Sequence, residues 1–366
     1  MAPPQSSVGA LAPPSDQAGG AQEAVRSAER ASGERFLLRS PFKALDLRAL
    51  KMQTGTILMQ CAHLSGLLLL VAACSGPSLS IVRDAPGVTI MSEDGVFATV
   101  HATARPRPFV WPVTAPGNKP VTRSYPMARE EGEQEDHPHH RSLWFAHGSV
   151  NGFDFWHTRA PQERIVHVAT ETKQVSANVV EVESDYAWKV ELGRVILRER
   201  RALRFEDHGD HRCIEVAVTL RATEGDVVLG DTKEGTFAMR LHPSLRVDGK
   251  VASGKLINSE GLSGKGVWGK RARWVHDYGP VDGDVVGVAI FDHPDNLRHP
   301  TWWHARTYGL VAANPFGVHH FEQRQSGAGD YVIKHGDELT LRYRAVIHSG
   351  AWDAARVEAA WRAWAR

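Results

Sequence analysis

Alternating apolar and polar residues characterise most of the chain after residue 80. In HRCIEVAVTLRA (211–222), apolar side chains occupy every second position from Ile214 to Leu220, and ELTLRYRAVIH (338–348) repeats the alternation. A period of two places successive side chains on opposite faces of an extended strand. Both segments are therefore predicted to be strands with one buried face.

Further segments show the same pattern, and short polar segments rich in Gly and Asp separate them as turns. The additional predicted strands span residues 95–101, 163–171, 175–184, 283–292 and 330–336. One convincing helix is expected, in WDAARVEAAWRAWAR (352–366), where Val357, Trp361 and Trp364 fall on one face. Strands that do not alternate with helices predict an all-β fold, a large antiparallel β-sandwich with a C-terminal helix.

The first 74 residues differ from the rest of the chain. Residues 1–51 are rich in Ala, Pro, Gly and Ser and are predicted to be disordered or a mis-assigned N-terminal extension. Residues 52–74 are predicted to be a lipoprotein-type signal peptide, because their apolar run is shorter than the roughly 20 residues of a membrane-spanning helix. LVAAC resembles a lipobox ending at Cys74, which would be lipidated. The alternative is a buried apolar helix. Residues 75–366 would form the single sandwich domain.

The charge balance excludes some classes of partner. Lys and Arg number 43 against 42 Asp and Glu, a formal net charge of +1, so no long-range field attracts nucleic acid or an anionic membrane. We expect an exported periplasmic or cell-surface lipoprotein that touches the membrane only through its anchor. The three cysteines show no paired metal-type spacing and no disulfide framework.

Histidine is concentrated in two segments. EDHPHHRSLWFAHGSVNGFDFW (135–156) contains four histidines, and ten of the 19 in the chain fall within 137–157 and 293–320. Both segments are predicted to be long loops between strands, where β folds carry their chemistry. If the loops converge, imidazoles would meet carboxylates, arginines and tryptophans. This mixture can stack on a sugar ring and hydrogen-bond its hydroxyls, so the expected ligand is a small-molecule or oligosaccharide substrate.

The segment DTKEGTFAMRL (231–241) offers a base for proton transfer. Lys233 or Arg240 could keep Glu234 ionised, while His140 or His304 supplies the acid. The predicted catalytic residues are therefore His140, Glu234 and His304. Asp136 or Asp154 is expected to orient His140 and raise its pKa. The alternative for Glu234 is an exposed ion pair at the end of a strand.

A larger set is predicted to bind the substrate by stacking, ion pairing or hydrogen bonding. It comprises Arg123, His139, Arg141, Trp144, Asn151, Trp156, Lys233, Arg240, Asp292, His293 and Trp303. Core packing is the alternative for Trp303. No cofactor is predicted, since HPHH and DHP lack a recognised ligand spacing, although a transition metal bound by the His-rich loops stays an alternative.

Several motifs together resemble one known family. RPFVWPVTAPGNKPVTRSYP (107–126), DHPHHRSLWFAHGSVNGFDFW (136–156), GDTKEGTFAMRL (230–241), the segment 289–317 and LRYRAVIHSG (341–350) resemble the PmoA-type family of secreted or lipid-anchored bacterial proteins. The family name implies a methane monooxygenase subunit, but no segment after residue 75 is apolar enough to span a bilayer. The family is similar to the galactose-mutarotase-like sandwiches of carbohydrate-active enzymes.

The predicted function is a carbohydrate-active enzyme, a hydrolase, lyase or epimerase that uses imidazole and carboxylate groups as acid and base. A non-catalytic carbohydrate-binding lipoprotein is the first alternative. A metal-dependent oxidoreductase, implied by the family name, is the second.

Overall fold

A computed structural model describes residues 76–84, 87–157 and 164–366. The predicted extension (1–51), the signal peptide (52–74) and the lipidation site Cys74 lie outside these residues. No helix within the described ranges is both long and apolar enough to cross a membrane.

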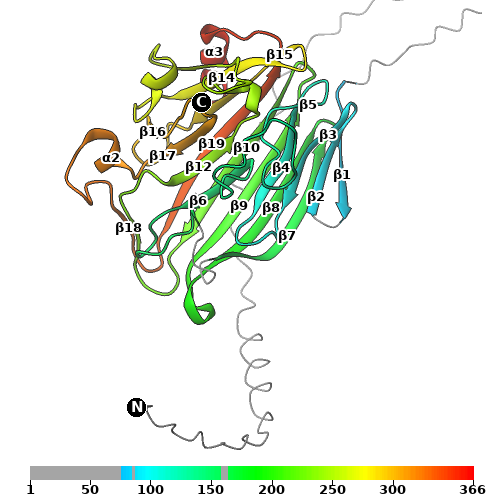
Figure 1. Cartoon of the computed structure of the whole chain (residues 1–366). Helices are drawn as coiled ribbons and strands as arrows, with labels where there is room; N and C mark the ends of the chain where they lie inside the picture. Colours follow the sequence, from blue (N-terminus) through cyan, green and yellow to red (C-terminus); the bar gives the residue numbers. More distant parts are fainter. Residues whose placement is uncertain (1–75, 85–86, 158–163) are drawn as a thin grey trace, which may run out of the picture. The chain divides into compact units, whose positions relative to one another are not determined.

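The described chain folds into two large antiparallel sheets and a small two-stranded one (Figure 1). In spatial order the nine-stranded sheet contains β1 (Leu79–Asp84), β2 (Gly87–Ser92), β3 (Gly95–His101), β4 (Phe109–Ala115), β6 (Leu143–His147), β12 (Gly235–Arg240), β17 (Leu310–Asn314) and β16 (Trp302–Trp303), with β5 (Lys119–Pro120) paired to β4.

The eight-stranded sheet contains β13 (Lys255–Asn258), β14 (Trp274–Val281), β15 (Asp284–Asp292), β19 (Glu338–Ser349), β10 (His211–Arg221), β9 (Val195–Asp207), β8 (Val179–Lys189) and β7 (Arg164–Ser176). β11 (Val227–Leu229) pairs with β18 (Tyr331–Ile333). The helices are α2 (Val318–Glu322) and α3 (Ala354–Trp364), with 3-10 turns at Glu191–Gly193, Pro243–Leu245 and Gly264–Val267.

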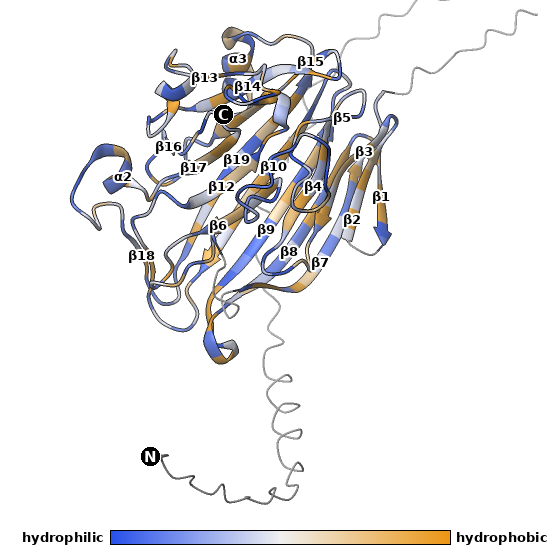
Figure 2. Ribbon diagram, in the orientation of Figure 1, coloured by the Kyte–Doolittle hydropathy of each residue, from blue (hydrophilic) through white to orange (hydrophobic). Residues whose placement is uncertain are grey.

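One apolar core joins the two large sheets. Phe237 of β12 stacks on Tyr343 of β19 with ring centroids 4.9 Å apart, and Phe97 of β3 meets Phe205 of β9 edge-on at 5.6 Å. Hydrophobic and hydrophilic residues are interleaved along strands such as β8 and β9 (Figure 2). The predicted antiparallel β-sandwich is therefore confirmed, with its core between the inner faces of the sheets.

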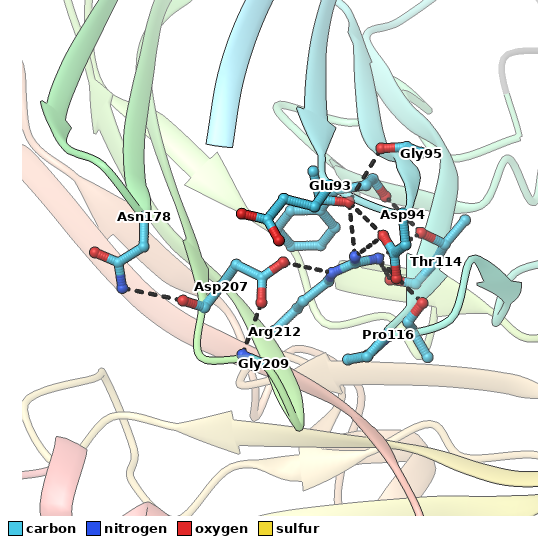
Figure 3. A network of polar contacts seen from close by, with 12 residues as sticks. Glu93, Asp94, Gly95, Thr114, Pro116, Asn178, Asp207, Gly209 and Arg212 are labelled. Atoms are coloured by element: carbon cyan, nitrogen blue, oxygen red, sulfur yellow. Dashed lines mark hydrogen bonds and ion pairs between the residues drawn. The ribbon is translucent and has the colours of Figure 1, made fainter. Parts of the chain in front are cut away.

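A buried ion-pair network also crosses between the sheets (Figure 3). The side chain of Arg212 on β10 is 2% exposed; its Nε donates to Asp207 Oδ2 at 3.0 Å and its Nη1 to Thr114 Oγ1 on β4 at 3.0 Å. Its Nη2 pairs with Asp94, in the turn between β2 and β3. Arg212 thus points inward, so its neighbours on β10 point to the outer face of the eight-stranded sheet.

The predicted C-terminal helix is confirmed as α3. The Asp353 side chain caps it by accepting from the Arg356 N–H at 2.8 Å. Val357 is buried, and Trp361 and Trp364 pack partly buried against the outer face of the eight-stranded sheet. The apolar face predicted from the sequence is thus the face of α3 that packs against the sheet.

Most predicted strands match closely, and two departures have clear causes. Residues 175–184 form no single strand, because a turn at Ala177 and Asn178 ends β7 at Ser176 and starts β8 at Val179. Leu143–His147, expected within a loop, is strand β6. All five of its residues are buried in the middle of the sheet, so no alternation marks it.

Candidate functional site

The candidate site lies on the outer face of the nine-stranded sheet, over β6 and β12. Trp144 on β6 pairs with Ala238 on β12. Since Phe237 points inward to Tyr343, alternation directs Trp144 and Arg240 outward. Both are fully buried nonetheless, because flanking segments of the chain cover this face.

Asp136 is the centre of an ion-pair cluster over this face. Its Oδ1 accepts from Arg240 Nη2 at 2.8 Å and from Arg123 Nη1, and its Oδ2 accepts from His137 Nδ1 at 2.8 Å. Burial would raise the pKa of Asp136, but Arg240, His137 and Arg123 together hold it below its ordinary value. The carboxylate is therefore ionised and joins three segments of the chain.

His140 is a buried ring within an aromatic stack. It lies between His137, at 4.8 Å between centroids, and Trp144, at 5.4 Å, and its Nδ1 accepts from Arg240 Nη1 at 3.1 Å. Burial, then the neighbouring His139 and Arg240, lower the pKa of His140 well below its ordinary value. A neutral ring that accepts at Nδ1 carries its proton on Nε2.

The expectation that Asp136 or Asp154 orients His140 and raises its pKa is wrong. Asp136 binds Arg123, Arg240 and His137 instead, and Asp154 binds His157.

Glu234 and His304 meet at the entrance to β12. Lys233 Nζ pairs with Glu234 Oε1 at 2.9 Å, and His304 Nδ1 donates to the Lys233 carbonyl at 2.9 Å. Burial would raise the pKa of Glu234, but the bond from Lys233 and the nearby His304 hold it below its ordinary value. Burial lowers the pKa of His304 to about 4. At neutral pH, Glu234 is therefore an anion and His304 a neutral ring whose Nε2 carries no proton.

A second imidazole–carboxylate pair belongs to this end of the site. Asp154 Oδ2 accepts from His157 Nδ1 at 2.8 Å, and Asp154 Oδ1 accepts from the backbone N–H of Trp156 and of His157, each at 2.9 Å. The His157 ring lies 4.8 Å from that of His139, and His157 is among the groups whose electrostatic influence lowers the pKa of Glu234. This pair was not among the predicted site residues, although its i, i+3 spacing is visible in the sequence.

Tyr308 connects the two ends of the site. Its ring stacks on His137 at 5.3 Å, and the guanidinium carbons of Arg240 and Arg306 lie 4.6 and 5.5 Å from its centroid. Burial raises the pKa of Tyr308, and the negative charges of Glu234 and Asp136 both act in the same direction. The clusters around these two carboxylates are thus neighbours within one polar site.

The structure brings many of the predicted site residues together. Trp156, tilted against Trp144 at 5.1 Å, lies beneath the stack. The predicted residues found in or directly under the site are Arg123, His139, His140, Trp144, Trp156, Lys233, Glu234, Arg240 and His304.

The other five predicted residues lie elsewhere. Asp292 is fully buried and accepts from Asn296, His299 and the Thr301 N–H, while His293 contacts Trp364 of α3 edge-on at 5.0 Å. Trp303 is in the core and donates to the Ala272 carbonyl. Arg141 donates to the Arg105 carbonyl, and Asn151 bonds the backbone of Asp226 and Val228. The predicted meeting of the two loops is thus partial, with His304 contributed by the second.

No set of metal ligands is evident in the described parts of the His-rich loops. Among all residues that the structure describes, His208, His211 and Cys213 alone form a group of three whose ligand atoms lie within 4.8 Å of one another. Metal binding by the His-rich loops stays a prediction.

Comparison with protein families places the chain. The model described as "Family of unknown function (DUF6807)" matches residues 88–362. The chain belongs to this family. No curated protein sequence matches it. No comparison supports the resemblance to the PmoA-type family, which stays a prediction.

Solved structures similar to this family member include three carbohydrate-related enzymes. An α-galactosidase from Geobacillus stearothermophilus aligns with TM-score 0.35 and 10% identity over 75% of this chain and 39% of its own. A putative aldose 1-epimerase from Escherichia coli K12 aligns with TM-score 0.29 and 11% identity over 76% and 100%, and a galactose mutarotase related enzyme from Lactobacillus acidophilus with 0.27 and 10% over 75% and 97%. The chain thus spans well under half of the α-galactosidase. At these TM-scores the structural similarity gives no information about the residues of the site.

Proposed function

We propose that this protein is a carbohydrate-active enzyme that moves protons on a sugar or glycoside. The observation that carries the proposal is the environment of Glu234. This partly buried carboxylate is kept ionised beside Lys233 and lies within electrostatic reach of His157 and His304, which come from segments almost 150 residues apart in the chain. Charged and neutral acid/base groups gathered in one place are typical of sites for general acid–base catalysis.

The contacts suggest a role for each of the catalytic groups. Glu234 is the base, since its low pKa leaves it without a proton at neutral pH. His157 is the proton donor, because the bond from its Nδ1 to Asp154 holds the ring in place within electrostatic reach of Glu234. His304 accepts a hydrogen bond through Nε2. His140, predicted to be catalytic, is instead proposed to position Arg240, whose bond it accepts.

The surroundings of Glu234 suit a polyhydroxylated ring. Tyr308 and His137 are partly exposed rings whose open edges can contact the C–H groups of a sugar, and Arg306 and Lys233 can donate to its hydroxyls. A hydrolase, a lyase or an epimerase would each use such a base and acid pair. The site's own polarity, and not the name of any similar protein, supports this substrate class.

Deuterium exchange tests the proposal most generally. The protein is incubated in D2O with a panel of aldoses, uronic acids and short oligosaccharides, and proton NMR follows lost C–H signals, new anomeric signals and cleavage products. Glu234→Gln keeps the shape of the side chain and removes the base, so turnover should fall by ~10²–10⁴. Glu322→Gln is the matched control, because Glu322 accepts from Trp302 at the end of α2 and should leave turnover within a few-fold of wild type.

The alternative is a binding protein, and the same panel separates the two. A sugar that binds wild type without any change in its NMR spectrum, and binds Glu234→Gln equally well, would contradict the enzymatic proposal. Normal turnover by Glu234→Gln would contradict the role of Glu234.

We further propose that the protein is exported and anchored through a lipid on Cys74. The support is the LVAAC motif after an apolar run. Mass spectrometry of the mature protein should find an acylated N-terminal Cys74; an unmodified peptide spanning Ala73 to Ser75 would contradict it.

A further inference from the structure

A second cluster of chemically active side chains lies on the other large sheet, at the hairpin between β9 and β10. It contains His208, His211 and Cys213, whose ligand atoms lie within 4.8 Å of one another. Because Arg212 points into the sandwich, His211 and Cys213 both point to the outer face of the sheet. The cluster is thus separate from the candidate site, which lies on the nine-stranded sheet.

We propose that His208, His211 and Cys213 bind a transition-metal ion of the Zn²⁺ class through two imidazole nitrogens and a thiolate. In a tetrahedral site with metal–ligand bonds of about 2.0–2.3 Å, ligand atoms lie roughly 3.5 Å apart. Rotations of the three side chains that shift their ligand atoms by about 1 Å would bring this cluster to that spacing. Binding replaces the thiol proton by the metal, and the proton leaves to solvent. A thiolate with two imidazoles favours Zn²⁺, Co²⁺ or copper over Mg²⁺ or Ca²⁺.

Carboxylates orient both imidazoles, as they do around metal-binding histidines. Asp210 Oδ1 bonds His211 Nδ1 at 2.7 Å, and Glu206 Oε2 bonds His208 Nε2 at 3.2 Å. The nitrogens left to bind a metal are therefore His211 Nε2 and His208 Nδ1. Water is the expected fourth ligand, because both carboxylate oxygens of Glu206, on the neighbouring strand, already bond Arg204, His208 and Arg344.

Exposure gives the ion a route into the site. The side chain of His208 is 38% exposed and that of His211 26%, whereas Cys213 is 1% exposed beneath them. Trp352 lies edge-on to His211, with centroids 5.3 Å apart, and forms an apolar wall. An ion arriving from solvent would meet the imidazoles first and the sulfur last.

The charged groups around Cys213 largely offset one another. Burial raises the pKa of the Cys213 thiol to about 12, and the nearby guanidinium of Arg344 acts in the opposite direction, so the metal ion itself must displace the thiol proton. Arg344 is itself held by Glu215 at 2.7 Å and by Glu206 at 3.5 Å. These carboxylates offset its charge, so the approach of a cation is not opposed by an isolated positive group.

Cobalt titration of chelator-treated full-length protein tests the proposal. We expect one equivalent of Co²⁺ to give sulfur-to-cobalt charge-transfer absorption and to quench Trp352 fluorescence, and Zn²⁺ to displace it. Cys213→Ala should abolish the charge-transfer band. His211→Gln should weaken binding at least tenfold, and Asp210→Asn by ~10–100-fold through loss of the orienting carboxylate.

His335→Gln is the matched control, because it removes an exposed imidazole at another turn and should leave the spectrum unchanged. Circular dichroism checks that each variant is folded. If Cys213→Ala does not fold, His208→Gln and His211→Gln still decide the question, since both rings lie at the rim. The proposal would be overturned if the wild-type protein shows no thiolate-to-cobalt band, or if the band survives these substitutions. Cobalt bound only by the histidines of the candidate site gives no such band and would overturn it as well.

Discussion

Replacing Arg240 by Met tests whether the ion-pair cluster of Asp136 holds the candidate site together. The Arg240 guanidinium donates to Asp136 at 2.8 Å and to His140 Nδ1 at 3.1 Å, and it is fully buried. Met fills much of the same volume but donates nothing. Hydrogen bonds to charged groups contribute about 1.5–3 kcal/mol each, and breaking a buried ion pair costs about 3–5 kcal/mol. Because Asp136 keeps Arg123, we expect a loss near the lower end, about 3 kcal/mol.

Urea unfolding followed by circular dichroism measures this loss. Arg306→Met is the matched control: its guanidinium faces the same Tyr308 ring at 5.5 Å, but the side chain is exposed, so its loss should change stability by no more than about 0.5 kcal/mol. Combining Arg240→Met with Asp136→Asn should cost less than the sum of the single changes, since the two groups interact. A loss below about 1 kcal/mol for Arg240→Met, or full additivity with Asp136→Asn, would refute the reasoning.

Three further predictions concern protonation and the C-terminal helix. The pKa of His304 in the folded protein is about 4, against an ordinary value of 6.5. Its contribution to stability is therefore complete above pH 6.5 and is lost as the pH falls toward 4. His304→Gln should flatten the dependence of the unfolding free energy on pH between these values. The lowered pKa of Asp136 adds stability that is present above its ordinary pKa of 3.8 and is lost as the pH falls further. Asp136→Asn should therefore make the loss of unfolding free energy at acid pH less steep. An unchanged pH dependence would contradict the ion pairing of Asp136. Val357→Ala should destabilise the protein by about 1–3 kcal/mol in thermal or urea unfolding, while Ala355→Gly, at an exposed helical position, should cost about 1 kcal/mol or less.

The sequence predicted the fold well where one face of a strand is buried and the other is not. β10 and β19 alternate and were placed within a residue of their ends, and the stripe of Val357, Trp361 and Trp364 predicted how α3 docks. β6 was missed for a physical reason: a strand buried on both faces in the middle of a sheet shows no period of two.

The site was harder to predict, because the composition of a loop does not determine which part of the fold the loop packs against. Alternation after Gly235 correctly separated Arg240 from Phe237, and Glu234 does lie beside Lys233 and His304. The His- and Asp-containing segment around His293 looks similar in the sequence, but His293 contacts Trp364 of α3 and the Asp292 side chain bonds Asn296, His299 and Thr301, which depends on packing between distant segments. The Asp154–His157 pair could have been found from its spacing.

The histidines between residues 137 and 157 differ in task, and their chemistry explains why imidazole is used for each. At the stack, His140 must be flat to lie against Trp144 and must accept a bond from a buried guanidinium. Phe would leave Arg240 Nη1 without an acceptor, and Lys would add a second positive charge; a neutral imidazole avoids both costs. Farther along, His157 bonds the Asp154 carboxylate and lies within electrostatic reach of Glu234, the proposed base. His140→Gln keeps an acceptor, so a positioning role predicts a moderate loss of stability and only a few-fold change in turnover. His157→Gln should lower turnover by ~10² or more with little effect on unfolding. The opposite pattern, measured on the same sugar substrate, would return the catalytic role to His140.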